Sequence, residues 1–68
     1  MQNQLYGLRK GHNETQKDLA RLLSISEGAY RNKENGKAEF KMSEMFMISD
    51  HYGIPIDQIF LPRKYTKC

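Results

Sequence analysis

The sequence predicts an all-α domain, a compact bundle of five short helices, for three reasons. Apolar residues recur three or four positions apart, as on one face of a helix, and nowhere alternate with polar residues over the length of a strand. Residues that typically start or stop helices, such as Thr15, Ser26 and Gly36, separate these runs. The chain has 68 residues, the length of one small domain.

The first helix is predicted over residues 2–11. Leu5 and Leu8 are three positions apart and give this helix an apolar face. We expect Gly11 and Asn13 to end it, because glycine and asparagine tolerate the left-handed backbone conformation found at helix C-termini.

The second helix is predicted over residues 15–23. Thr15 is expected to be its N-cap, and Asp18 follows three positions later, which resembles a capping box. Four apolar residues supply the inner face of this helix: Leu19, Ala20, Leu22 and Leu23.

The third helix is predicted to run from its N-cap, Ser26, to about Glu34, and Asn35-Gly36 is a helix-stop signal. The segment carries a glycine in its middle and charges on several sides, so it is poorly equipped to bury itself. We infer that one face of this helix is meant for a partner other than the protein's own core.

The fourth and fifth helices are predicted over residues 42–52 and 55–60. Gly53 stops the fourth, and Pro55 can begin the fifth because proline is tolerated where no N–H donor is needed. In the preceding loop, Phe40 is expected to anchor the chain to the core. Five residues are expected to share one face of the fourth helix: Met42, Met45, Ile48, Ser49 and Tyr52.

Only the segment Leu23-Ser24-Ile25 separates the second and third helices. A gap this short forces the two helices to cross steeply, which is the geometry of a helix-turn-helix. Such a pair places its second helix in the major groove of DNA, with its first residues against the base edges. The apolar spacing agrees with this geometry, since five residues can face inward together: Leu19, Ala20, Leu23, Ile25 and Tyr30.

The net charge of the chain is +3, and it is distributed unevenly. Residues 15–41 contain six Lys or Arg against four acidic residues, and residues 61–68 add three positive charges and no acid. This distribution fits a polyanionic partner, but a solvated basic surface would show the same pattern. Charge alone leaves both interpretations open.

No feature of the sequence predicts an enzyme, a cofactor or a metal site. His12 and His51 are far apart and lack metal-ligand spacing, and Thr15 and Ser26 are better explained as caps than as nucleophiles. Cys68 is the single cysteine, so no disulfide can form within one chain, which agrees with the reducing cytoplasm. The longest apolar run, MFMI, is far too short to cross a bilayer, so no membrane contact is expected.

Three segments carry a resemblance to a known family: TQKDLARLLSIS, then ENGK, then YGIPIDQIF. In this order they resemble the Cro and lambda-repressor type of helix-turn-helix domain, over about residues 5–60. The pattern from Tyr30 to Phe40 further resembles short regulators of phage and bacterial origin. The resemblance implies a five-helix DNA-binding domain over residues 1–60, followed by a short basic tail over residues 61–68. It also implies binding to operator DNA as a dimer.

The resemblance assigns roles to individual residues. Gln16, Glu27, Gly28 and Asn32 match positions that contact DNA bases. Asn32 has the groups to pair bidentately with adenine, and Glu27 those to accept from cytosine N4. Six residues match positions near the DNA backbone: Thr15, Lys17, Ser26, Arg31, Asn35 and Lys37.

Arg9 and Glu34 fit a family ion pair that ties the first helix to the end of the third. Three residues depart from the family pattern. Ser24 stands where the turn usually has glycine, and Gly28 offers no side chain at a base-reading position. Lys33 replaces a usual apolar residue, so we expect its stem to pack while its ammonium group reaches solvent or phosphate.

The leading hypothesis is a sequence-specific transcriptional regulator, a repressor that binds paired half-sites on double-stranded DNA as a homodimer. A chain this short holds no large effector domain, so no small-molecule effector is expected. The alternative is a protein-interaction module, such as an antitoxin or antirepressor component with weak DNA specificity; Glu27 and Gly28 keep it open because neither attracts phosphate. The expected dimer surface is the fifth helix and the tail, with Ile56, Phe60 and Leu61.

Overall fold

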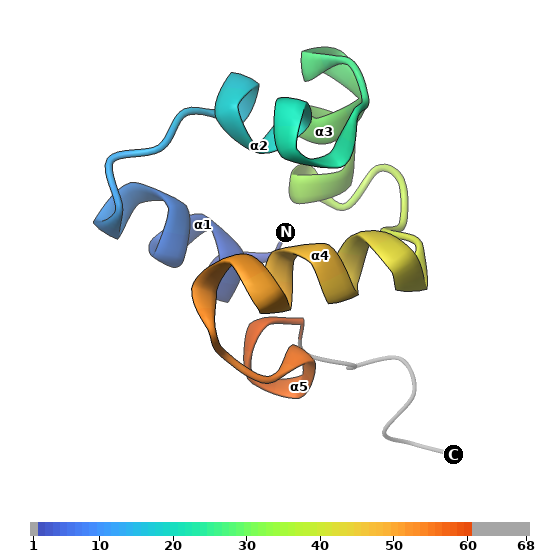
Figure 1. Cartoon of the computed structure of the whole chain (residues 1–68). Coiled ribbons are helices and arrows are strands. Elements are labelled where there is room, and N and C mark those ends of the chain that lie inside the picture. Colours follow the sequence, from blue (N-terminus) through green and yellow to red (C-terminus); the bar gives the residue numbers. More distant parts are fainter. Residues whose placement is uncertain (1, 61–68) are drawn as a thin grey trace.

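The computed structural model describes residues 2–60, which form five helices (Figure 1). The helices are α1 (Asn3–Gly11), α2 (Gln16–Leu23), α3 (Glu27–Asn35), α4 (Met42–Tyr52) and α5 (Ile56–Ile59). No strand occurs between residues 2 and 60, so the predicted all-α architecture is confirmed. In the same part of the chain, no helix has the length and apolar character needed to cross a bilayer. The predicted basic tail, with Leu61 and Cys68, lies outside the described residues.

The ends of α1 and α2 are set by local capping. Thr15 and Asp18 form the predicted capping box: Thr15 Oγ1 accepts from the Asp18 backbone N–H at 3.1 Å, and Asp18 Oδ2 accepts from the Thr15 N–H at 2.9 Å. At the end of α1, Gly11 remains within the helix and Asn13 takes the left-handed conformation, with φ of 58°. Asn13, and not Gly11, therefore turns the chain toward α2.

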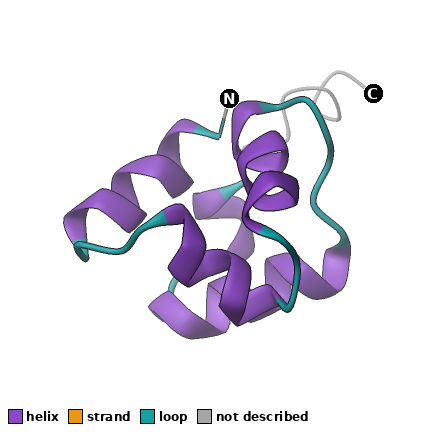
Figure 2. Ribbon diagram, turned by 90° about the horizontal axis from the view of Figure 1, so that it is seen from above, coloured by secondary structure: helices purple, strands orange, loops and turns teal. Residues whose placement is uncertain are grey.

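The turn between α2 and α3 bends without a glycine. Ser24 lies in the left-handed region, with φ of 59° and ψ of 41°, and the Ile25 N–H donates to the Ala20 carbonyl at 3.0 Å. Ser26 then caps α3, since its Oγ accepts from the Ala29 N–H at 3.1 Å. Seen from above, α2 and α3 run in different directions on either side of this short turn (Figure 2), as the helix-turn-helix prediction requires.

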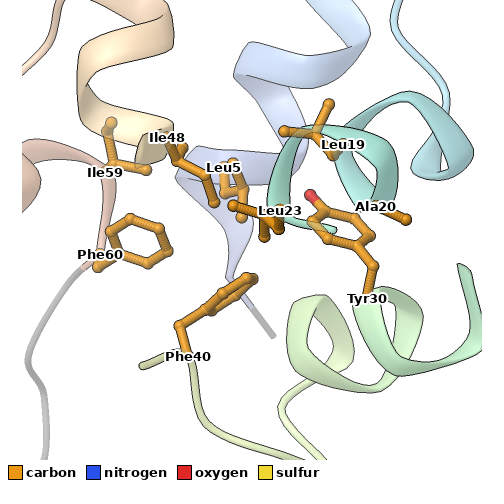
Figure 3. Packing of buried hydrophobic residues seen from close by; sticks show 9 residues of the cluster. All are labelled: Leu5, Leu19, Ala20, Leu23, Tyr30, Phe40, Ile48, Ile59 and Phe60. Atoms are coloured by element: carbon orange, nitrogen blue, oxygen red, sulfur yellow. The ribbon is translucent and has the colours of Figure 1, made fainter. Parts of the chain in front are cut away.

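The core lies where the helices meet. Helix α2 packs on α3 and α4, and α5 packs on α4 and α1. Phe40 is buried, as predicted; its ring contacts Tyr30 and Phe60 edge-on, with centroid distances of 6.0 and 5.1 Å. The buried apolar cluster is drawn in Figure 3 and consists of Leu5, Leu19, Ala20, Leu23, Tyr30, Phe40, Ile48, Ile59 and Phe60.

One expectation about apolar residues is wrong. Phe60, expected at a dimer surface, is 6% exposed because it packs on Phe40 in the core. Of the five residues expected to share one face of α4, Ile48 is fully buried, whereas Met42, at the first turn, is 60% exposed. The face of α4 that turns inward is centred instead on Ile48 and Glu44.

Candidate nucleic-acid interface

Helix α3 has one face held by the protein and one face left uncovered by residues 2–60. On the inner face, Tyr30 and Glu34 are buried. The opposite face is exposed and carries Glu27, Gly28, Arg31, Asn32 and Asn35. A helix that is polar over most of its circumference is not stable without contacts to other elements, and the inward side chains of α3 supply them.

The inner face is held by hydrogen bonds to one carboxylate, that of Glu34. Arg9 donates to it twice, Nε to Oε2 at 2.9 Å and Nη2 to Oε1 at 3.2 Å. The Tyr30 hydroxyl donates to Oε2 at 3.0 Å. Gln16 Nε2 donates to Oε1 at 3.0 Å. This one carboxylate therefore joins α1, α2 and α3, and we call these four residues the Glu34 network.

The ionisation of Glu34 follows from these contacts. Burial alone would raise the pKa of this carboxyl, but hydrogen bonds from Arg9, Gln16 and Tyr30 lower the pKa below its ordinary value. Burial also raises the pKa of the Tyr30 phenol, so its hydroxyl stays a donor. At neutral pH the Glu34 carboxylate is thus ionised, and each of its two oxygens accepts two hydrogen bonds.

The network fixes the orientation of Gln16. Because an ionised carboxylate can only accept, the amide nitrogen of Gln16 and not its carbonyl oxygen faces Glu34. The side chain is half-buried, whereas the other predicted base-contacting residues, Glu27, Gly28 and Asn32, are exposed. Sequence patterns did not indicate this hydrogen bond, since it joins residues on different helices.

The six residues predicted near the DNA backbone are all exposed: Thr15, Lys17, Ser26, Arg31, Asn35 and Lys37. Gly36, with φ of 89°, ends α3, and the Lys37 N–H donates to the Asn32 carbonyl at 2.8 Å. This bond fixes the segment that carries Lys37 beside the last turn of α3. The start of α2 is also close to the last turn of α3, because Gln16 contacts Glu34.

The exposed face of α3 carries one loose ion pair. Arg31 Nη2 lies 3.7 Å from Glu27 Oε2, and both side chains are about half exposed. Exposed pairs at this spacing contribute only about 0.3–0.5 kcal/mol, so the pair can rearrange when a charged partner approaches. Arg31 can therefore leave Glu27 for such a partner.

The side chain of Lys33 is packed as expected, but the expectation for its ammonium group is wrong. Its Nζ lies 2.6 and 2.8 Å from the two carboxylate oxygens of Glu44, and the side chain is only 12% exposed, so the ammonium group is paired inside the domain instead of reaching solvent. Glu44 Oε1 also accepts from the Lys41 N–H at 2.8 Å. Burial raises the pKa of the Glu44 carboxyl, but the bond from Lys33 and the Lys41 N–H outweigh it and lower the pKa. This pair fixes α3 to α4.

A further polar cluster joins the end of α4 to the loop before α2. Tyr52 Oη donates to Glu14 Oε1 at 2.6 Å, and His51 Nε2 lies 2.6 Å from Glu14 Oε2. The rings of His12 and His51 both contact the Tyr52 ring, with centroid distances of 4.9 and 4.8 Å. The two histidines, distant in sequence, are therefore close in the fold. Even so, no group of three potential metal ligands occurs in residues 2–60.

Comparison with known proteins agrees with this geometry. The sequence model of the helix-turn-helix family matches residues 5–59. An uncharacterized HTH-type transcriptional regulator of Methanocaldococcus jannaschii is 36% identical over 61 residues, which cover 90% of this chain and 92% of that protein. No solved structure gives a significant match.

Proposed function

The chain belongs to the helix-turn-helix family, and on this basis we propose that it is a DNA-binding transcriptional regulator that places α3 in the major groove. One observation supports the proposal above the others: the outer face of α3 is exposed along its whole length, while Tyr30 and Glu34 hold its inner face. The relative from Methanocaldococcus jannaschii, named as a transcriptional regulator, supports the same function. The proposal places the protein in the cytoplasm, with the DNA that it binds.

Base recognition is proposed for Glu27, Gly28 and Asn32 on α3, with Gln16 beside them. Asn32 has the donor and acceptor needed for a bidentate pair with adenine, and Glu27 can accept from cytosine N4. Gly28 has no side chain, so the backbone of α3 can approach the bases closely at this position; a Cβ there would meet no other atom of the domain. Gln16 still has a second amide N–H to donate after its bond to Glu34.

Phosphate contacts are proposed for the six exposed residues around this face: Thr15, Lys17, Ser26, Arg31, Asn35 and Lys37. Three of them are cationic. If each neutralises one phosphate, the logarithm of the binding constant for one half-site should fall with the logarithm of the salt concentration at a slope of about −3. These contacts set the position of α3 but do not select the sequence.

We propose further that the protein is a repressor of the Cro and lambda-repressor type, which binds paired half-sites as a homodimer. Two copies related by a two-fold axis would present two α3 helices to successive turns of the groove, about 34 Å apart. Occupancy of a promoter would then exclude polymerase without any chemical step. The described residues of each copy need no cofactor for this action.

Titration of labelled duplexes with the full chain tests the proposal. The DNA upstream of the protein's own gene is compared with a random duplex of equal length, at two salt concentrations. We expect binding to both duplexes to weaken steeply with salt, and the upstream DNA to bind more tightly. Absence of binding to either duplex at low salt would refute the proposed function.

A further inference from the structure

Arg31 lies among the residues of α3 for which base contacts are proposed. Successive residues of a helix are about 100° apart around its axis and rise about 1.5 Å along it. Arg31 is exposed and falls about 40° around the axis from Glu27, whereas Asn32 falls about 140° from Glu27 on the same side. Arg31 therefore lies between Glu27 and Asn32, both around the axis and along it. A groove that those two residues reach also faces Arg31.

The Arg31 side chain extends toward the start of α3. Its Nη2 lies 3.7 Å from Oε2 of Glu27, one turn nearer the N-terminus of the helix. In a helix-turn-helix, the first residues of the second helix lie against the base edges. Gly28, which follows Glu27, has no side chain to occupy the space there. The guanidinium therefore lies over the part of α3 that approaches the bases.

Arg31 is the cation that α3 offers to a partner. The structure describes this helix in full, and its other basic residue, Lys33, is paired with Glu44 inside the domain. The Arg31 side chain is about half exposed. Its distance of 3.7 Å from Glu27 is too long for a hydrogen bond, so this contact leaves the N–H donors of the guanidinium available.

The two charged groups match the major-groove edge of a G·C base pair. In that pair guanine O6 and cytosine N4 are hydrogen-bonded to each other, so they lie about 2.9 Å apart. The donor Arg31 Nη2 and the acceptor Glu27 Oε2 lie 3.7 Å apart, a similar spacing with complementary hydrogen-bonding character. Arg31 can therefore donate to guanine O6 while Glu27 accepts from the amino group of the cytosine.

The shape of the guanidinium favours guanine over the other bases. Arginine presents its N–H donors in a rigid planar fork, and guanine offers two neighbouring acceptors, O6 and N7. Thymine offers one acceptor, O4, with a methyl group beside it, and adenine places an amino donor beside its N7. An A·T pair in either orientation would therefore leave one N–H of the Arg31 fork without an acceptor.

We propose that Arg31 and Glu27 together recognise one G·C base pair, with Arg31 on the guanine and Glu27 on the cytosine. The inference rests on the proposed function, because it needs α3 in the major groove, and it adds a feature of the DNA sequence that is recognised. It also moves Arg31 from the proposed phosphate contacts to the base contacts.

Selection from a pool of duplexes, randomised over about two helical turns, tests the proposal with the full chain. We expect the wild type to enrich a G·C pair, and Arg31→Ala and Glu27→Ala each to lose the preference at that same pair. Arg21→Ala is the matched control, because Arg21 is exposed on α2 and should not affect the enriched sequence. The inference is overturned if the wild type enriches no G·C pair, if Arg31→Ala keeps the preference, or if the two variants lose it at different pairs.

A change in the DNA separates base reading from a phosphate contact. 7-Deazaguanine lacks the N7 acceptor and leaves the phosphates unchanged, so in place of the enriched guanine it should weaken wild-type binding about five-fold or more. The same replacement should not change the affinity of Arg31→Ala, which has no fork to bind N7. Inosine keeps O6 and N7 and lacks the minor-groove amino group, so it is the matched control and should bind like guanine. Equal effects of 7-deazaguanine on the two proteins would overturn the inference.

These measurements keep the inference apart from the proposed function. Glu27 and Arg31 are about half exposed and their pair contributes little to stability, so both variants should melt within about 4 °C of the wild type. A wild-type chain that binds no duplex at low salt would refute the proposed function and the inference with it. A wild-type chain whose enriched sequence does not depend on Arg31 would overturn the inference alone.

Discussion

Replacement of Glu34 by glutamine tests the account of how α3 is held. The side chain is 1% exposed and accepts bonds from Arg9, Gln16 and Tyr30. Glutamine keeps the volume but removes the charge, which leaves the Arg9 guanidinium, in a side chain 7% exposed, without its counter-ion. Removal of one partner from a buried ion pair typically costs about 3–5 kcal/mol. We expect the lower end, about 3 kcal/mol, because Arg9 Nη1 keeps its bond to the Glu14 carbonyl.

This loss is large for so small a domain. A core of this size contributes only about 3–5 kcal/mol of net stability, so Glu34→Gln should be close to unfolding at room temperature. In a domain of 60–100 residues each 1 kcal/mol shifts the melting temperature by roughly 4–8 °C, so the melting temperature should fall by more than 10 °C. Circular dichroism during urea and thermal unfolding measures both quantities.

Glu27→Gln is the matched control on the same helix. Its carboxylate pairs with Arg31 at 3.7 Å, and both side chains are about half exposed. The pair and the helix dipole together should contribute less than about 1 kcal/mol. Equal losses for the two variants would refute the argument that the buried network, and not the amide substitution itself, fixes α3. So would a Glu34→Gln protein as stable as the wild type.

Three further outcomes are expected. Ser24→Gly should stabilise the fold by about 0.5–1 kcal/mol in urea unfolding, since glycine relieves the left-handed conformation of this turn; a destabilised variant would contradict this. The melting temperature should fall progressively below about pH 4.5, because the pKa values of Glu34 and Glu44 are lowered in the fold, so the unfolded chain takes up protons first. An unchanged melting temperature at pH 3 would count against this. In DNA titrations, Lys37→Ala should weaken binding to every duplex and reduce the salt slope by about 1. Asn32→Ala should cost about 1–3 kcal/mol of binding free energy on the specific site alone. Equal losses on all duplexes would show that Asn32 does not read a base.

The helix bounds could be predicted from the sequence because their causes are local. The capping box of Thr15 and Asp18 spans four residues, and the Ser26 cap bonds within its own first turn. Such signals need no knowledge of the rest of the fold. The bond between Gln16 and Glu34 depends instead on how α2 meets α3, and no pattern within either helix encodes it.

The orientation of α4 shows the same limit and has a consequence for function. Apolar spacing grouped Met42 with Ile48 on one face of the fourth helix and gave Glu44 no role. In the fold Glu44 is buried, since it neutralises Lys33 and accepts from the Lys41 N–H. The inward face of α4 is therefore rotated toward Glu44, and Met42 is turned outward beside Phe46. The pair between Lys33 and Glu44, which the sequence did not reveal, thus fixes which side of α4 is buried.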